Sequence, residues 1–411
     1  MSLEAPTRRR DGEYTSDRTS DRALFSTLRA TLAYAREREY TGWDYGDGMS
    51  SRLLQAVPLD SRLLNLVVQE TIKRSPVNLR PLFLVEQRRN HKGAALFAMA
   101  NRTVDELAPA VDADPEPVDY RAETRTLLDW LLEQDAGGYR GFCVGHQHPI
   151  QDLQGLAERN EPDAVCTSYA VKALLRAADL DPAYPSAART AAEFVVDELD
   201  YRPTDHGARI TYSGNHDGSY YTLNAGALAA RLFVDLYDHF GTDEFRRRAT
   251  ELLDHIDAKQ EPNGGWQYRD PPSASHLSMD THHNGFILET FQRYADVVAT
   301  SRYADAVERS LRFHRETLFR DDGAPNFDES SAYPRDIHAS AQGVLVFSYA
   351  GDFERARRVI EWTLDNLYAG DGRFHFRKHR LFTNRVTLMR WCQAWMAYAI
   401  AEYLAARHLR T

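Results

Sequence analysis

An internal repeat is the feature that most constrains how this 411-residue chain folds. In each repeat an amphipathic helical segment is followed by a loop that holds glycine and an aromatic residue, and then by a second, more apolar helical segment. A period of about fifty to seventy residues with two helices per unit is typical of helical hairpins that pack side by side. The repeated loops are 135–142, 261–270, 321–330 and 370–379, with looser versions at 40–48 and 205–214.

The two helices of each repeat differ in polarity, and this difference predicts their places. A helix with one polar face lies against solvent, whereas a helix that is apolar nearly all round is covered on both sides. Six such pairs predict an all-α fold, a six-hairpin α/α toroid with short β-hairpins in the loops. The apolar helices are expected to begin near Arg52, Ala164, Tyr221, Thr281, Asp336 and Arg385, with an extra helical insertion at 82–107.

Closure of the ring also predicts the domain organisation and the place of a site. Residues 1–20 are polar and are expected to form a flexible N-terminal arm. Residues 21–411 are expected to form a single α/α toroid catalytic domain. The loops that join outer to inner helices all leave at one end, so the N-termini of the inner helices converge there on a central cavity.

Composition and charge exclude several classes of protein. A net charge of −10 argues against a nucleic-acid binder with a broad basic face. No transmembrane segment is expected because no long apolar run exists, and the N-terminus lacks the apolar core of a signal peptide, so a cytoplasmic location is expected. The three cysteines, Cys143, Cys166 and Cys392, are far apart and form no CxxC pattern, so no disulfide framework is predicted.

Aromatic, acidic, amide and guanidinium side chains gather in the loops and helix starts that the ring brings together. A sugar needs such groups, because aromatic faces stack on it, polar groups bond its hydroxyls, and guanidinium forks hold an acidic substituent. The candidate catalytic residues are Asp44, Asp163, Asp336, His282 and His338. The candidate substrate-binding residues are Trp43, Asp47, Tyr139, Arg140, Tyr169, Tyr221, Trp266, His283, Asn284 and Arg385.

Several of these residues could instead have a purely structural role. Asp163, Asp280 and Asp336 precede predicted helices, where Asp is a favoured N-cap. Three at one end of the ring, each soon followed by Tyr or His, favour a site. His282 and His283 point about 100° apart on a helix, so only one is expected to face the cavity squarely. His338 suits proton transfer near physiological pH.

Known signatures of metal and cofactor chemistry are missing from the sequence. There is no HExxH motif and no His pair at four-residue spacing with a third ligand nearby, and the pair His146 and His148 is a weak signal. No metal and no cofactor are therefore predicted. The absence of GxSxG, P-loop and GxGxxG patterns argues against esterases, NTPases and dinucleotide enzymes.

The six hairpins with aromatic, Asp-bearing loops resemble the six-hairpin glycosidase superfamily over nearly all of the chain after about residue 21. Within it the unsaturated glucuronyl hydrolases are most similar, and the sugar 2-epimerases share the same toroid. The segments 43–54 and 282–291 also resemble a group of archaeal and bacterial polysaccharide-biosynthesis proteins, one of which takes part in archaeal N-glycosylation.

The resemblance implies three different sets of catalytic residues. The glucuronyl hydrolases use a pair of acidic residues, which implies Asp44 or Asp47 together with Asp163. The epimerases use histidines, which implies His282, His283 and His338. The glucuronyl epimerase family relies on tyrosines, which implies Tyr139, Tyr169 and Tyr221. These alternatives exclude one another, and all three stay open at this point.

The expected function is modification of a uronic-acid-containing sugar or glycan intermediate by an isomerase or epimerase, in surface polysaccharide or N-glycan assembly. The alternatives are a glycoside hydrolase with paired Asp residues and a non-catalytic glycan-binding protein. The expected partner is a saccharide or lipid-linked glycan substrate, with association with glycan-assembly enzymes at the membrane face and no nucleic acid. Arg385 is expected to hold the substrate carboxylate, and Trp43 and Trp266 to stack on the sugar.

Overall fold

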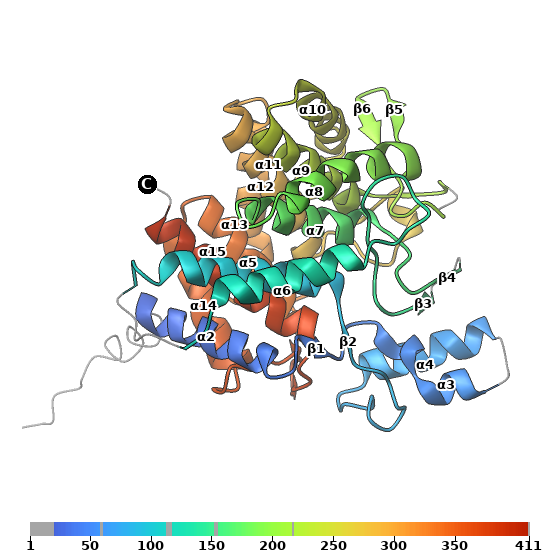
Figure 1. Ribbon diagram of the computed structural model, residues 1–411, viewed down its shortest axis with the longest axis vertical. Helices are drawn as coiled ribbons and strands as arrows, with labels where there is room; N and C mark the ends of the chain where they lie inside the picture. Colours follow the sequence, from blue (N-terminus) through green and yellow to red (C-terminus); the bar gives the residue numbers. More distant parts are fainter. Residues whose placement is uncertain (1–19, 58–60, 112–116, 152–154, 216–217, 410–411) are drawn as a thin grey trace, which may run out of the picture.

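A computed structural model describes residues 20–57, 61–111, 117–151, 155–215 and 218–409 (Figure 1). Of the predicted N-terminal arm, residues 1–19 lie outside the described residues. Ser20 is the N-cap of helix α2 (Asp21–Arg36), and its hydroxyl accepts a hydrogen bond from the backbone N–H of Ala23 at 3.3 Å. The predicted boundary between arm and toroid thus coincides with a capped helix start.

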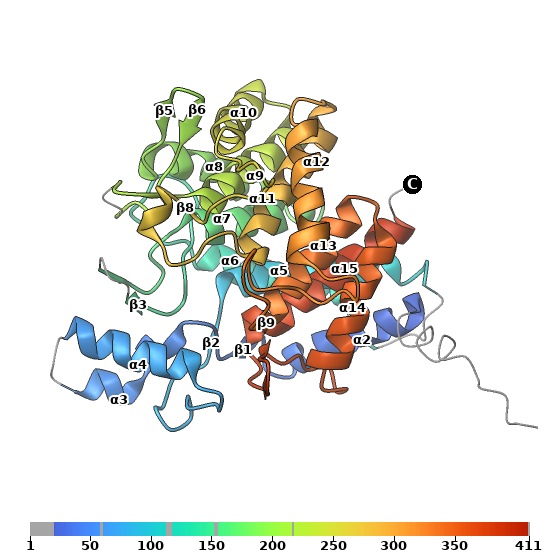
Figure 2. The same ribbon diagram turned by 180° about the vertical axis from the view of Figure 1, so that it is seen from behind.

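Helices form two concentric layers around one axis, as Figures 1 and 2 show from opposite sides. Each inner helix packs on the next one along the chain, and the last packs on the first, so the inner ring is closed. The inner helices are α5 (His91–Leu107), α7 (Ala164–Arg176), α9 (Leu223–Phe240), α11 (Thr281–Val298), α13 (Ile337–Tyr349) and α15 (Trp395–His408). The outer helices are α2, α6 (Tyr120–Glu133), α8 (Ala183–Glu193), α10 (Asp243–Asp257), α12 (Ala304–Phe313) and α14 (Phe353–Leu367).

The two layers differ in burial as the sequence predicted. Outer helix α10 buries one stripe that includes Phe245, Ala249 and Leu252, and its other faces are polar. Inner helix α13 is buried from Ile337 to Ser348 without a break. The all-α toroid is confirmed, because apolar side chains on two sides of a helix require two covering layers.

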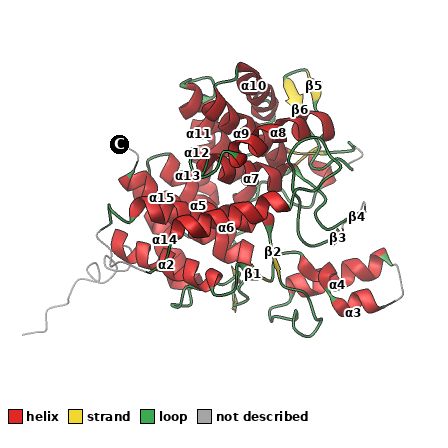
Figure 3. Ribbon diagram, in the orientation of Figure 1, coloured by secondary structure: helices red, strands yellow, loops and turns green. Residues whose placement is uncertain are grey.

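Strands are short and confined to the loops (Figure 3), as predicted. Several of them join neighbouring loops at the end of the ring where the inner helices begin; β7 pairs with β8, and β9 pairs with β10. The strands are β1 (Thr41–Gly42), β2 (Arg88–Arg89), β3 (Ile150–Gln151), β4 (Leu156–Ala157), β5 (Arg202–Thr204), β6 (Gly207–Arg209), β7 (Tyr221–Thr222), β8 (Arg269–Asp270), β9 (Arg335–Asp336), β10 (Arg377–Lys378) and β11 (Thr383–Asn384). Short 3₁₀ turns are η1 (Asp47–Ser50) and η3 (Pro272–Ala274), and π-helical turns are η2 (Phe194–Glu198), η4 (His314–Leu318) and η5 (Met389–Ala394).

The prediction that the first inner helix begins near Arg52 is wrong. The segment that begins at Arg52 forms α3 (Arg52–Ala56) and α4 (Arg62–Arg74), which project away from the ring in Figure 1. Helix α4 buries only Gln69 and Ile72, whereas α5, which lies in the predicted insertion 82–107, is buried along most of its length. The inserted element is therefore the α3–α4 hairpin. Amphipathic spacing alone does not distinguish a ring helix from a projecting one.

The last inner helix also begins later than predicted. The backbone after Arg385 is extended up to Leu388, and the π-helical turn η5 then leads directly into α15. This shift moves Arg390 and Trp391 into the first turn that faces the ring axis. A π-helical turn at such a position is common at functional sites.

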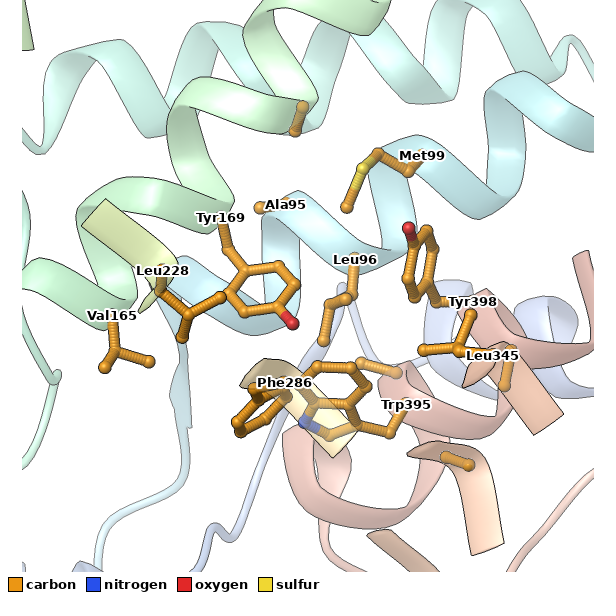
Figure 4. Close-up of a cluster of buried hydrophobic side chains, with 14 of the residues drawn as sticks. Ala95, Leu96, Met99, Val165, Tyr169, Leu228, Phe286, Leu345, Trp395 and Tyr398 are labelled. Atoms are coloured by element: carbon orange, nitrogen blue, oxygen red, sulfur yellow. The ribbon is translucent and has the colours of Figure 1, made fainter. Parts of the chain in front are cut away.

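An aromatic layer crosses the ring axis and separates the two ends of the toroid. Figure 4 shows Tyr169, Phe286 and Trp395 pointing toward one another from three inner helices or their starts. The ring centroids of Tyr169 and Trp395 lie 5.2 Å apart in an edge-on arrangement, and those of Phe286 and Trp395 lie 5.5 Å apart.

No helix of the described residues combines the length and the hydropathy that a membrane span requires.

Candidate active site

A cavity of about 440 Å³ opens at the end of the ring where the inner helices begin. Its walls include His146, Asp163, Tyr212, Tyr268 and Arg269. A larger cavity of about 700 Å³ opens at the opposite end, but its central cations are paired with neighbouring carboxylates. The smaller cavity is therefore the candidate site, because unpaired acid–base groups lie in it and beside it.

Three histidines are grouped behind Tyr268, a residue of the cavity wall, and one carboxylate orients two of them. The Nδ1–H of His282 donates to Oδ1 of Asp280 at 3.0 Å, and the Nδ1–H of His283 donates to Oδ2 at 2.6 Å. A carboxylate accepts only, so both rings present Nε2 to their other neighbours. The ring of His283 lies 4.5 Å from Tyr268, which lines the cavity.

Electrostatic interactions keep the carboxylate of Asp280 ionised. Burial by itself would raise the pKa of Asp280, but the two imidazoles more than offset that effect and hold the pKa far below its ordinary value. Burial lowers the pKa of His283 to about 4 despite the neighbouring carboxylate. At neutral pH Asp280 is therefore ionised and His283 is a neutral imidazole.

His338 completes the histidine group from the adjacent inner helix. Its ring stacks on His282 at 4.7 Å and meets Trp391 edge-on at 4.5 Å. The residue is 1% exposed, and neither ring nitrogen has a hydrogen-bond partner among the described residues. Burial, with the charges of His282 and Lys92, lowers the pKa of His338 well below its ordinary value. A neutral imidazole with two unused nitrogens is equipped to take or give a proton.

Asp336 positions the wall beside His338. It caps α13 by accepting from the backbone N–H of His338 at 2.8 Å, and the same oxygen accepts from Trp391 Nε1 at 2.8 Å. Its second oxygen accepts from Arg377 Nε at 2.5 Å. Trp391 in turn stacks on Tyr45 at 4.2 Å. Since both carboxylate oxygens are engaged, Asp336 has the positioning role of an N-cap and not the catalytic role that was predicted for it.

Asp44 and Asp47, in the first loop, are each held by an arginine. Asp44 Oδ2 accepts from Arg390 Nε at 2.7 Å, and both residues are buried. Asp47 accepts from Arg80 Nε at 2.8 Å and from the backbone N–H of Asp44 at 3.0 Å. Asp47 is therefore a support for Asp44 and not a substrate ligand, because its oxygens are committed to groups of the chain.

Lys92, which was not among the predicted site residues, lies at the same end of the ring, and its ammonium stands over the rings of Tyr169 and Trp395 at 5.7 and 5.9 Å from their centroids. It belongs to the first turn of α5, is 5% exposed, and has no hydrogen bond or ion pair with any described residue. Burial, followed by the charge of Arg390, lowers its pKa to about 8, and Cys166, Asp163 and Asp44 partly oppose this shift. An ammonium without a carboxylate partner beside a cavity is available to an anionic substrate group.

Replacing Lys92 by methionine should stabilise the folded protein at pH 7. The lowered pKa means that the folded state holds the ammonium at a cost below about pH 8, and removing it should raise the free energy of unfolding by about 2–3 kcal/mol. The gain should shrink above pH 8, where the wild-type lysine loses its proton in the folded state. Urea unfolding at pH 7 and at high pH checks this.

The matched control for that variant is Lys378→Met on strand β10, which should change stability by no more than ~0.5 kcal/mol. A Lys92→Met protein that is less stable than the wild type at pH 7 would contradict the buried, unpaired ammonium.

Four predicted residues have structural roles away from the cavity. Trp266 is fully buried, and its Nε1 donates to the carbonyl of Ile256 at 2.8 Å, so it cannot stack on a sugar. The amide oxygen of Asn284 accepts a hydrogen bond from the backbone N–H of Trp266, and its amide nitrogen donates one to the carbonyl of Trp266. Tyr169 belongs to the aromatic layer. Trp43 donates to Val85 O at 3.1 Å and lines a different, external cavity.

The other displaced residues also lie outside the lining of the cavity. Tyr139 packs edge-on against Phe194, and Arg140 is exposed and pairs with Asp197 at 3.1 Å. Tyr221 lies under the guanidinium of Arg209, at 3.8 Å from its ring centroid. The preceding Tyr220 lines the cavity instead, because successive strand residues point to opposite sides. Arg385 is exposed on the external cavity, so it cannot hold a substrate carboxylate in the site.

The structure thus brings together Asp44, Asp163, Asp336, His282, His283 and His338 at one end of the ring. Asp163 also caps its helix, since its Oδ1 accepts from the backbone N–H of Cys166 at 2.7 Å. The candidate functional residues that the sequence did not single out are Lys92, Arg269 and Trp391. The available signal for Lys92 was its rarity, since the chain has only five lysines, together with Asn90 two residues before it, a residue type that favours helix N-caps.

No protein-family model matches the sequence, and none of the curated proteins matches it. Solved structures do match the fold. Cellobiose 2-epimerase from Bacillus thermoamylovorans superposes with a TM-score of 0.58 at 10% identity, over 76% of this chain and 86% of that chain. A possible GH105-family member from Salmonella enterica gives 0.59 at 12% identity, over 98% of this chain and 99% of that chain.

A family 76 glycoside hydrolase from Bacteroides thetaiotaomicron is similar to the same degree, with a TM-score of 0.58 at 11% identity over 93% of this chain and 76% of that chain. Identities this low establish the fold alone. The resemblance to the six-hairpin glycosidase superfamily is confirmed at that level: this chain has the α/α toroid that these epimerases and glycoside hydrolases share.

Proposed function

We propose that this protein is a carbohydrate-active enzyme, a sugar isomerase or epimerase that moves a proton at a carbon next to a carbonyl group. The observation that carries the proposal is the neutral, unpartnered His338 stacked at 4.7 Å on His282, whose Nδ1 is bonded to Asp280. An imidazole held by a carboxylate at one nitrogen is oriented and made more basic at the other. Two such rings side by side supply both partners of a proton exchange.

The proposed step uses only groups of this chain. One imidazole takes the proton from the carbon beside the carbonyl; the electron pair of that C–H bond forms a double bond to the carbonyl carbon, and the π pair of the carbonyl moves onto its oxygen. The Lys92 ammonium stabilises the negative charge that develops on that oxygen. Return of a proton to the carbon, from the same ring or from the other, then yields the isomer or the epimer.

We further propose a substrate that carries a carboxylate, as in a uronic acid. Two cations support this. Lys92 lacks a carboxylate partner among the described residues, and Arg269 lines the cavity with a buried Nε that has no hydrogen-bond partner there. Arg269 stacks over Tyr220 at 3.7 Å, which holds its guanidinium plane in place. Arg269 takes the role that was predicted for Arg385, and Lys92 adds to the positive charge that attracts an acidic sugar.

Solvent exchange tests the proposed reaction. D-glucuronic acid and cellobiose, incubated separately with the protein in D₂O, should give at least one product that differs in stereochemistry or carbonyl position and carries deuterium at the reacting carbon. Mass spectrometry with NMR measures both properties. Unlabelled sugars after prolonged incubation, or a split product from the disaccharide, would count against proton transfer beside a carbonyl.

A glycoside hydrolase is the second candidate, and one observation favours it. Burial raises the pKa of Asp163, and its Oδ2 has no hydrogen-bond partner in the described parts of the chain, as a proton donor to a glycosidic oxygen requires. Against it, Asp44, the other predicted carboxylate, is neutralised by Arg390. Release of a free monosaccharide that is lost in Asp163→Asn would favour this alternative.

A further inference from the structure

Three potential metal-ligand atoms meet beside the cavity at the start of α7. Nε2 of His146 lies 3.8 Å from Oδ2 of Asp163, and Sγ of Cys166 lies 3.8 Å from Nδ1 and 3.9 Å from Nε2 of the same imidazole. The ligand atoms of the three residues all lie within 4.8 Å of one another. An imidazole, a carboxylate and a thiol form a donor set that suits Zn²⁺ and related transition metals.

The separation of the imidazole and the carboxylate leaves room for an ion between them. Zinc–ligand bonds of about 2.0–2.3 Å in a tetrahedral arrangement place neighbouring ligand atoms about 3.3–3.6 Å apart. The observed separations of 3.8–3.9 Å exceed that range by a few tenths of an ångström. They are too long for a hydrogen bond between the imidazole and the carboxylate. A small contraction around one ion would satisfy all three groups.

An independent observation is the second oxygen of Asp163. The residue is 2% exposed, its Oδ1 is used by the helix cap, and its Oδ2 has no hydrogen-bond partner among the described residues. Leaving a buried carboxylate oxygen without a partner is costly. That oxygen faces His146, and both residues line the cavity. The site therefore has an unsatisfied anionic ligand directed at the other two donors.

A second group of potential metal ligands, Asp280 with His282 and His283, has no carboxylate oxygen that lacks a hydrogen-bond partner. Both oxygens of Asp280 already accept from imidazole nitrogens at hydrogen-bond distances of 3.0 and 2.6 Å. Its geometry is explained without an ion.

We propose that His146, Asp163 and Cys166 bind a Zn²⁺ ion with a fourth coordination position open to the cavity. The thiolate and the carboxylate together balance the charge of the ion, and the nearby Arg390 is already paired with Asp44 at 2.7 Å. Three protein ligands with one open position are typical of a catalytic zinc and not of a structural one. This inference replaces the expectation that no metal is bound, and it does not rest on the proposed function.

Cobalt substitution tests the site on the full-length protein. After dialysis against a chelator, Co²⁺ should bind at one equivalent per chain and give a thiolate-to-cobalt charge-transfer band together with the intense visible bands of a four-coordinate ion, and Zn²⁺ should displace it. Cys166→Ser should abolish the charge-transfer band. His146→Gln and Asp163→Asn should each weaken binding by more than the ~10-fold to 100-fold that changes outside the ligand shell cost.

Matched controls separate loss of a ligand from loss of the fold. Asp163→Asn keeps an oxygen for the helix cap and removes the anionic ligand. Cys143→Ser removes another buried thiol that lies outside both three-ligand groups of the described chain, so the spectrum should be unchanged. Circular dichroism establishes whether each variant is folded.

A wild-type Co²⁺ spectrum without the thiolate band would overturn the proposal even if every variant failed to fold. Unchanged Co²⁺ affinity and spectrum in folded Cys166→Ser and Asp163→Asn would do the same. Because binding is read by absorption and stoichiometry, a protein that binds Co²⁺ as described but catalyses no proton exchange would refute only the proposed function.

Discussion

Replacing His338 by glutamine should lower turnover of a responding sugar by about 10²–10⁴-fold, the usual contribution of a positioned acid–base group. The neutral ring of His338 is the only imidazole of the site, among the described residues, with both nitrogens unpartnered. Glutamine keeps much of the volume beside Trp391 and Trp395 but cannot exchange a proton. His282→Gln should have an effect of similar size, because it removes the ring that His338 faces at 4.7 Å.

Deuterium incorporation in D₂O, followed by mass spectrometry at several substrate concentrations, measures these losses in kcat separately from changes in KM. The matched control is His255→Gln, on outer helix α10, which also replaces a buried histidine whose pKa burial lowers to about 4. It should retain activity. Equal losses in His255→Gln and His338→Gln would mean that the effect comes from folding and not from proton transfer.

Replacing Asp280 by asparagine tests whether the carboxylate only orients the two imidazoles or also makes them more basic. Asparagine can still cap α11 and accept from one imidazole, but it cannot hold both rings by charge. A fall in kcat together with a shifted pH profile is therefore expected, whereas a purely structural role for Asp280 would leave the pH profile of the remaining activity unchanged.

Glu289→Ala should be the most destabilising single change in the inner ring, with a loss of about 3–5 kcal/mol in the free energy of unfolding. Its carboxylate accepts from Lys172 at 2.8 Å, Arg231 at 3.0 Å and Gln342 at 3.0 Å, and it is 3% exposed. Removal leaves two cations in the interior without this partner. Chemical denaturation at pH 7 measures the loss.

The control is Glu308→Ala, which breaks the exposed pair with Arg312 at 2.8 Å on α12. Exposed pairs of this spacing contribute only about 0.3–0.5 kcal/mol. A Glu289→Ala protein as stable as Glu308→Ala would show that the network contributes little.

The pH dependence of this effect has a definite sign. Burial by itself would raise the pKa of Glu289, but Lys172 and Arg231 more than offset it and hold the pKa below its ordinary value. The network therefore contributes its full stability above the unfolded pKa of about 4.3 and loses it as the pH falls through the lower folded value. The difference in stability between wild type and Glu289→Ala should accordingly narrow in acid.

Much of the fold was predictable because its signals are local. The one-sided apolar stripe of α10 and the unbroken apolar run of α13 each follow from a few consecutive turns of sequence. Helix capping was the structural alternative for Asp163, Asp280 and Asp336, and all three do accept from the backbone at the start of an inner helix. Capping needs only neighbours within one turn.

The two errors in helix assignment explain why Lys92 and Trp391 were missed. With the first inner helix placed at Arg52, the first turn of α5 was not counted among the helix starts around the cavity, and Lys92 was overlooked. With the last one placed at Arg385, the turn η5 that carries Trp391 was also passed over. Periodicity alone does not tell which of two neighbouring amphipathic segments the ring will take.

The number of hairpins, the polarity that separates the two layers, and the end of the ring where His, Asp and aromatic residues gather could all be predicted from local sequence patterns. Which of those residues meet could not be predicted in this way. The pairing of Asp44 with Arg390, the burial of Trp266, and the contact of His146 with Asp163 and Cys166 depend on how each helix is rotated about its axis. That rotation is set by side-chain packing between segments far apart in the chain, which no local pattern encodes.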